Sequence, residues 1–185
     1  RNTGGVLVFD LPDLPQQRGH DIRIFNNRIF NNNTPNFAPK GNIVGTVTTG
    51  TGVMIMANSN VEIFGNEIQD HKTISLLMIS YHSTGNQIND PKYYPFPEAV
   101  HVHSNTFGVG GETPQGEGGK LMARFFGTPL PDIVWDGVIN RDKWAGGVPP
   151  PGEGIYIHDN MKTGGTVTFG NMGGLATLND PANAE

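Results

Sequence analysis

The sequence contains no cysteine, no run of basic residues and no long apolar stretch. Without cysteine the chain can form neither disulfide bonds nor thiolate zinc sites, although this absence leaves its compartment open. The net charge of −5 and the scattered lysines and arginines argue against a nucleic-acid partner and an anionic membrane surface. No apolar stretch approaches the roughly eighteen residues needed to cross a bilayer. We therefore expect neither a nucleic-acid ligand nor a membrane span.

Strong helix formers are also scarce, since the 185 residues include only 8 alanines and 9 leucines. The chain has 26 glycines, 14 prolines and 19 asparagines, and glycine and asparagine are the residues that accept left-handed backbone at turns. Its apolar residues form short clusters such as 53–56 and 74–79, which argues against disorder. The composition predicts an all-β fold of short strands joined by tight corners.

One short pattern recurs along the chain. Two apolar residues flank a variable residue, and an asparagine stands three positions after the second apolar residue. The copies are residues 22–29, 61–68, 100–107 and, more loosely, 155–162. Asn27, Asn66 and Asn105 are each 39 residues apart, and other short strands precede the first three copies. Such a repeated supersecondary unit is the signature of a stacked architecture.

The repeat favours a right-handed parallel β-helix with long loop insertions. Residues 52–73 contain the compact unit of strand, Asn corner, strand, Asn corner and short strand that suits one coil of a solenoid. The repeated asparagine is expected to adopt the left-handed backbone of the corner and to form a hydrogen-bonded ladder. An antiparallel sandwich would also give alternation and turns. The residues expected to be buried between coils are Val6, Val8, Ile22, Ile24, Val53, Ile55, Ile63, Val102 and Ile157.

We predict a single domain over residues 1–185, the C-terminal part of a longer solenoid. Loops 31–51, 82–98 and 141–153 should lack extended regular structure and should pack over the solenoid through Phe37, Tyr94 and Trp144. The glycine-rich segment 108–120 is expected to be weakly structured, and its residues 108–111 lack the following helix and the lysine of a phosphate loop.

The ends of the chain carry a further expectation. The first strand, at residues 5–9, leaves no room for a cap, so further coils or another protein chain should cover the N-terminal edge. The polar segment 179–185 is typical of a finished end.

Residues 4–12, 36–44 and 52–59 resemble bacterial parallel β-helix repeat-containing proteins of the pectate-lyase-like superfold. The resemblance extends through residues 131–137 to 157–160, and so covers most of the chain. It implies an exported protein (periplasmic, cell-surface or extracellular) whose longer relatives carry further coils ahead of this region. It implies no defined activity.

Enzymes of this superfold that act on acidic polysaccharides need a group that neutralises the substrate carboxylate, a base and an acid. The catalytic candidates are Lys72, Tyr81, His101, His103 and Arg124. The segment Asp70–His71–Lys72 lacks the proline and the second aspartate of the alginate-epimerase motif, which argues against that activity. We expect no cofactor and no metal: the acids are scattered, and His101 and His103 lack an evident third ligand, although His158 aligns one repeat later.

A polar surface is expected on the outer side of the repeat strands. Stacking should place His101 over Glu62 and Arg23, and His103 over Phe64 and Phe25. The binding candidates are Arg23 and Glu62 in this surface, with Tyr94 and Trp144 as loop rings for sugar stacking. The sequence favours an exported β-helix scaffold or a polysaccharide-interacting surface protein. The alternative is a polysaccharide lyase or C5-epimerase that acts on acidic glycans.

Overall fold

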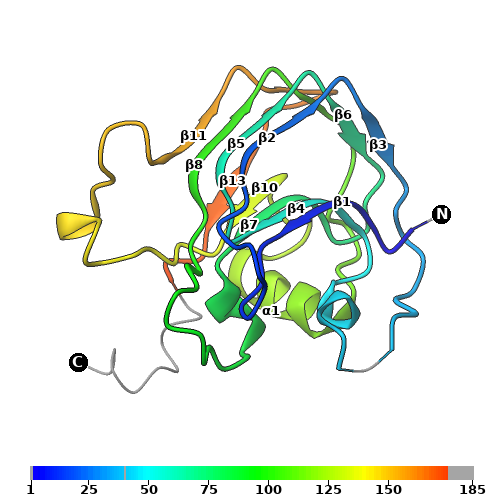
Figure 1. Cartoon of the computed structure of the whole chain (residues 1–185). Coiled ribbons are helices and arrows are strands. Elements are labelled where there is room, and N and C mark those ends of the chain that lie inside the picture. Colours follow the sequence, from blue (N-terminus) through cyan, green and yellow to red (C-terminus); the bar gives the residue numbers. More distant parts are fainter. Residues whose placement is uncertain (1, 40, 175–185) are drawn as a thin grey trace.

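The computed structural model describes residues 2–39 and 41–174 and consists mainly of three parallel β-sheets (Figure 1). Sheet A contains, in spatial order, β1 (Gly4–Phe9), β4 (Thr51–Met56), β7 (Ile74–Ile79), β10 (Ile133–Trp135) and β13 (Phe169–Asn171). Sheet B contains β2 (His20–Phe25), β5 (Ser59–Phe64), β8 (Glu98–His103) and β11 (Ile155–His158). Sheet C contains β3 (Arg28–Phe30), β6 (Glu67–Gln69), β9 (Thr106–Phe107) and β12 (Met161–Lys162). The segment 179–185 lies outside the described residues.

The chain adds one strand to each sheet in turn. We call three consecutive strands, one from each sheet, a coil: β1–β3, β4–β6, β7–β9 and β10–β12. Each strand pairs in parallel with its counterparts in the neighbouring coils, as Val6 with Val53 and Val53 with Leu76. This pairing confirms the predicted β-rich fold with parallel strands, and an antiparallel sandwich does not agree with it.

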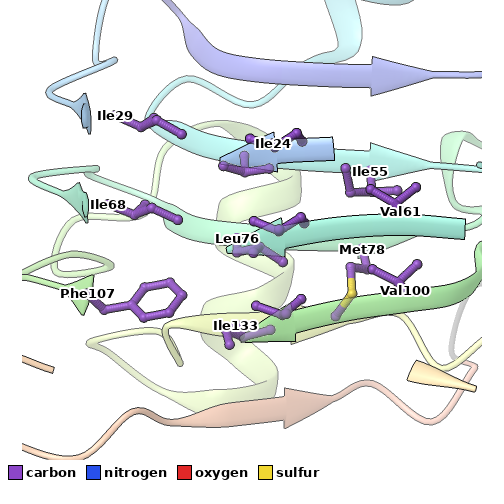
Figure 2. Packing of buried hydrophobic residues seen from close by; sticks show 13 residues of the cluster. Ile24, Ile29, Ile55, Val61, Ile68, Leu76, Met78, Val100, Phe107 and Ile133 are labelled. Atoms are coloured by element: carbon purple, nitrogen blue, oxygen red, sulfur yellow. The ribbon is translucent and has the colours of Figure 1, made fainter. Parts of the chain in front are cut away.

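The core lies in the space that the three sheets enclose. Its columns run across the coils, as Figure 2 shows for Ile29, Ile68 and Phe107 on one side and Leu76 and Ile133 on another. The predicted core residues Ile24, Val53, Ile55, Ile63 and Val102 are buried, as expected.

Four other predicted core residues are only partly buried: Val6, Val8, Ile22 and Ile157. They pack against the cluster, but each belongs to the first or the last coil. One of their two neighbours along the column is therefore missing among the described residues, and the prediction of full burial is wrong for them.

The corner between sheets B and C carries an asparagine ladder. The side-chain oxygen of Asn66 accepts from the backbone and side-chain nitrogens of Asn27, both at 3.0 Å. Asn105 and Asn160 continue the ladder with the same pair of bonds at 2.9–3.1 Å. The sequence predicted a left-handed backbone at the ladder asparagine, and this prediction is wrong. The left-handed residue is the one before it: Asn26, Gly65, Ser104 and Asp159 have φ of 52–64°. The ladder asparagines then keep their amides aligned along the coils.

Helix α1 (Gly116–Phe126) follows the glycine-rich segment, so the prediction of weak structure without a helix is wrong. Met122 on this helix packs with Met54, Leu77 and Val134 on the outer face of sheet A. Because this packing stabilises the helix, its glycines do not prevent it from forming. Figure 1 shows α1 alongside sheet A.

Between the strands, the described residues of the three long loops contain only the short 3₁₀ turns η1 (Ile43–Thr46), η2 (Tyr81–Thr84) and η3 (Ala145–Gly147), as predicted. Trp144 is buried beside Trp135, which confirms its role as an anchor. Phe37 is 81% exposed, so that prediction is wrong. The side-chain amide of Asn36 instead ties this loop together through the carbonyls of Val44 and Val47, each at 2.9 Å.

Candidate functional site

The outer face of sheet B carries two rows of side chains in register. The first row is Arg23, Glu62, His101 and Tyr156, and the second is Phe25, Phe64, His103 and His158. We call these eight residues the outer stripe. The register predicted for His101 and His103 is confirmed. Tyr156 was missed as a site residue, although it occupies the matching position of the fourth repeat copy, which was the signal that could have found it.

The second row is a continuous stack of rings. Phe25 and Phe64 stack with their centroids 5.2 Å apart, Phe64 and His103 at 5.3 Å, and His103 and His158 at 5.2 Å, with interplanar angles of 3–7°. Each inner ring therefore has both faces covered by its neighbours. The row can offer ring edges and imidazole nitrogens to a ligand, but few free ring faces.

Three residues of the outer stripe, Arg23, Glu62 and His103, pair with one another. Glu62 accepts from Arg23 Nε at 2.7 Å, and its other oxygen lies 3.2 Å from His103 Nε2. The hydrogen bond from Arg23, followed by that from His103, lowers the pKa of Glu62 below its usual range. Glu62 is thus an ionised acceptor that holds Arg23 and His103 in place.

His101 and Tyr156 lie side by side at the other end of the first row. Their ring centroids are 4.6 Å apart, and the rings are tilted by 33°. Both side chains are partly exposed. An imidazole and a phenol at this separation can exchange hydrogen bonds with the same ligand.

The other catalytic candidates lie elsewhere. Lys72 is exposed at the corner between β6 and β7, where its backbone nitrogen donates to Asn33. Tyr81 is buried in η2 with an edge-to-face contact to Tyr93, and Arg124 is exposed on α1, which covers sheet A. The structure therefore does not bring Lys72, Tyr81 and Arg124 together with the histidines of sheet B.

His71 is a buried structural residue. Its Nε2 lies 3.1 Å from the carbonyl oxygen of Ile29, and burial lowers its pKa. Lys72 beside it faces solvent, so the two side chains of this segment do not form one site.

The two loop aromatics proposed for sugar stacking have other partners. Tyr94 donates its hydroxyl to the buried Glu98, and the Arg18 guanidinium lies 4.5 Å from its ring centroid. Burial, followed by the hydrogen bond with Glu98, raises the pKa of Tyr94 to about 12. Trp144 is buried. Neither ring is a free platform for a sugar.

Within residues 2–39 and 41–174 no group of three or more His, Asp or Glu side chains is placed to hold a metal ion. The rings of His103 and His158 stack in parallel rather than converge, and His101 belongs to the other row. In the same part of the chain no helix combines the length and the apolar character required to cross a bilayer.

Comparison with known proteins gives no relative for this chain: no family model matches it, and no curated protein or solved structure matches it either.

Proposed function

We propose that the protein is an exported parallel β-helix that binds a neutral polysaccharide along the outer stripe of sheet B. The observation that carries the proposal is the pair of in-register rows on one parallel sheet. A polymer with a repeated hydroxyl pattern matches a surface whose polar groups repeat at the strand spacing of about 4.8 Å.

The three parallel sheets support a right-handed β-helix. Crossovers between parallel strands of one sheet are right-handed in nearly all proteins, because twisted strands pack back on the sheet in that sense. Here every crossover passes through one strand of each other sheet. The resemblance to bacterial parallel β-helix repeat proteins supports the same architecture and an exported location.

The polar groups of the outer stripe suit sugar hydroxyls. Glu62 offers carboxylate acceptors, Arg23 has further guanidinium donors beyond the one that it gives to Glu62, and His101 and Tyr156 offer one imidazole and one phenol. The stack from Phe25 to His158 fixes the second row, so less side-chain entropy is lost on binding.

The pairing of charges favours a neutral glycan over an acidic one. An acidic polysaccharide needs a cation that is free to meet its carboxylate, whereas Arg23 already pairs with Glu62 at 2.7 Å. A ligand carboxylate at this place would also meet the negative charge of Glu62.

Titration calorimetry with soluble neutral and acidic polysaccharides tests the proposal. The double variant His101→Ala/Tyr156→Ala should bind a neutral glycan about tenfold more weakly than the parent chain, because it loses two polar contacts. The control is Arg28→Ala/Glu67→Ala, which likewise truncates two neighbouring polar side chains, here an exposed ion pair of 3.0 Å on sheet C. Equal loss in both variants would contradict binding at the outer stripe, and no binding of any glycan would leave a rigid scaffold as the better interpretation.

A second candidate is a lyase or C5-epimerase that acts on acidic glycans. The observation that favours it is the close pair His101 and Tyr156 in the same row as Arg23, because an imidazole and a phenol can serve as base and acid. An acidic glycan incubated with the protein would then gain unsaturated or epimerised residues, detectable by ultraviolet absorbance and NMR. This product should disappear in Tyr156→Phe.

A further inference from the structure

The outer face of sheet A carries a cleft of about 450 Å³ that is separate from the outer stripe. Strands β4 and β7 form its floor, and α1 and the loops with η1 and η2 form its sides. Its apolar lining consists of Phe9, Ile43, Met54, Met56, Leu77, Ile79, Leu121, Met122 and Met172. Its volume lies within the usual range of small-molecule sites.

Methionine is prominent in this lining. Met54 and Met56 come from β4, Met122 from α1, and Met172 directly follows β13. Their unbranched thioether side chains adjust to irregular apolar shapes at low energy. Such walls suit a flexible aliphatic chain or a small ring.

Among the described residues, Asp136 is the one acidic residue in the lining of this cleft. Its Oδ2 accepts from the backbone nitrogen of Ser80 at 2.6 Å and from Ser83 Oγ at 2.5 Å, and its Oδ1 accepts from the backbone nitrogen of Val138 at 3.0 Å. A carboxylate oxygen has two lone pairs, so Oδ1 can accept one bond more. Burial raises the pKa of Asp136 to about 6, which leaves it mostly ionised at neutral pH.

We propose that this cleft binds a small apolar molecule with a primary amine head group, with the ammonium placed at Asp136. The apolar walls bury the hydrocarbon part, and the buried carboxylate complements the positive charge. Ser83, Thr84 and His82 also line the cleft and add polar groups to its wall. A ligand with a carboxylate head would instead meet the negative charge of Asp136.

Titration calorimetry of the whole chain with octylamine, octanol and octanoate tests this site at neutral pH. The three probes share the alkyl chain and differ in the head group. Octylamine should bind about tenfold more tightly than octanol, because a charge-assisted hydrogen bond is stronger than a neutral one, and octanoate should bind most weakly. Equal affinity for octylamine and octanol would overturn the assignment of an amine.

Two variants, each with a control, locate the site. Asp136→Asn should remove the preference for octylamine and retain octanol binding, while Asp142→Asn, which removes an exposed carboxylate outside the lining, should retain the preference. Leu121→Trp enlarges a half-exposed side chain of the lining and should weaken all three probes. Its control is Phe125→Trp, an equally exposed position of α1 outside the lining, which should change nothing. If Leu121→Trp binds the probes like Phe125→Trp, the amine binds elsewhere and the proposal fails.

Discussion

At each corner between sheets B and C, two adjacent residues have different tasks. The first adopts the left-handed backbone that turns the chain, as Ser104 does with φ of 53°. The second, such as Asn105, carries the ladder. Asn105 is fully buried, and its amide nitrogen donates to the carbonyls of Ile63 and His103 and to the side chain of Asn160, each at 2.9 Å.

Asn105→Ala should therefore lower the free energy of unfolding by about 2–4 kcal/mol, because it leaves buried carbonyl groups without donors. The matched control is Asn27→Ala, which removes the exposed end of the same ladder and should have a clearly smaller effect. Urea denaturation followed by circular dichroism measures both. Equal losses would show that burial of the ladder contributes little.

The sequence predicted the ladder but placed the left-handed backbone on the wrong residue. The asparagine repeats at one position, whereas the residue before it varies among Asn26, Gly65, Ser104 and Asp159. Three of these residues have short polar side chains, and the fourth is glycine. Such a property is harder to recognise in one sequence than a repeated residue.

Among the elements, α1 shows how tertiary packing overrides local preference. Gly116, Gly118 and Gly119 lie in its first turns, and Gln115 at its start makes no capping side-chain bond. Each interior glycine costs about 1 kcal/mol relative to alanine, so the sequence gives little sign of a helix. The burial of Met122 against sheet A provides the missing stability. This contact is not visible in a sequence without knowledge of the fold.

Gly118→Ala should raise the free energy of unfolding by about 0.5–1 kcal/mol, because alanine is the better helix former. Gly118 is exposed, and a Cβ there would come within 4 Å of a single atom, Thr48 Oγ1 at 2.9 Å, a side-chain hydroxyl that can rotate away. Gly119→Ala is the matched comparison at the next position. There a Cβ would lie 3.1 Å from the backbone of Pro114 and from Thr73, so the gain should vanish. Thermal denaturation distinguishes the two variants, and an equal gain in both would contradict the packing at Gly119.

For the whole molecule, burial depends on the place of a coil in the stack. Ile63 in the second coil is fully buried, whereas Ile157, at the matching position of the fourth coil, is only partly buried. We expect Ile63→Ala to lower the free energy of unfolding by about 3–4 kcal/mol and Ile157→Ala by roughly half as much. Urea denaturation gives both values. A larger loss at Ile157 would mean that the last coil is not the weaker end.

The repeat predicted more of the candidate site than the loops did. Because the first three copies are 39 residues apart and keep their internal spacing, the sequence placed Arg23, Glu62 and His101 in one row. The corners between sheets that vary in length contain Lys72, Tyr81 and Arg124. The path of such a segment depends on its packing, so their separation from sheet B could not be read from the pattern. The cleft beside sheet A was missed for the same reason, since loops and α1 form its sides.

The corners between sheets differ in the number of residues that they can contain, and this has an evolutionary consequence. The corner from sheet B to sheet C has two residues in every coil, as at Asn26–Asn27 and Ser104–Asn105. One added residue would exchange the inward-facing and outward-facing side chains of the following strand. The corner from sheet C to sheet A varies from residues 70–73 to residues 108–132. Insertions and deletions can therefore accumulate at such corners while the strand register is inherited unchanged. Related chains could therefore differ in the loops around sheet A, and with them in binding specificity, while they keep the same fold.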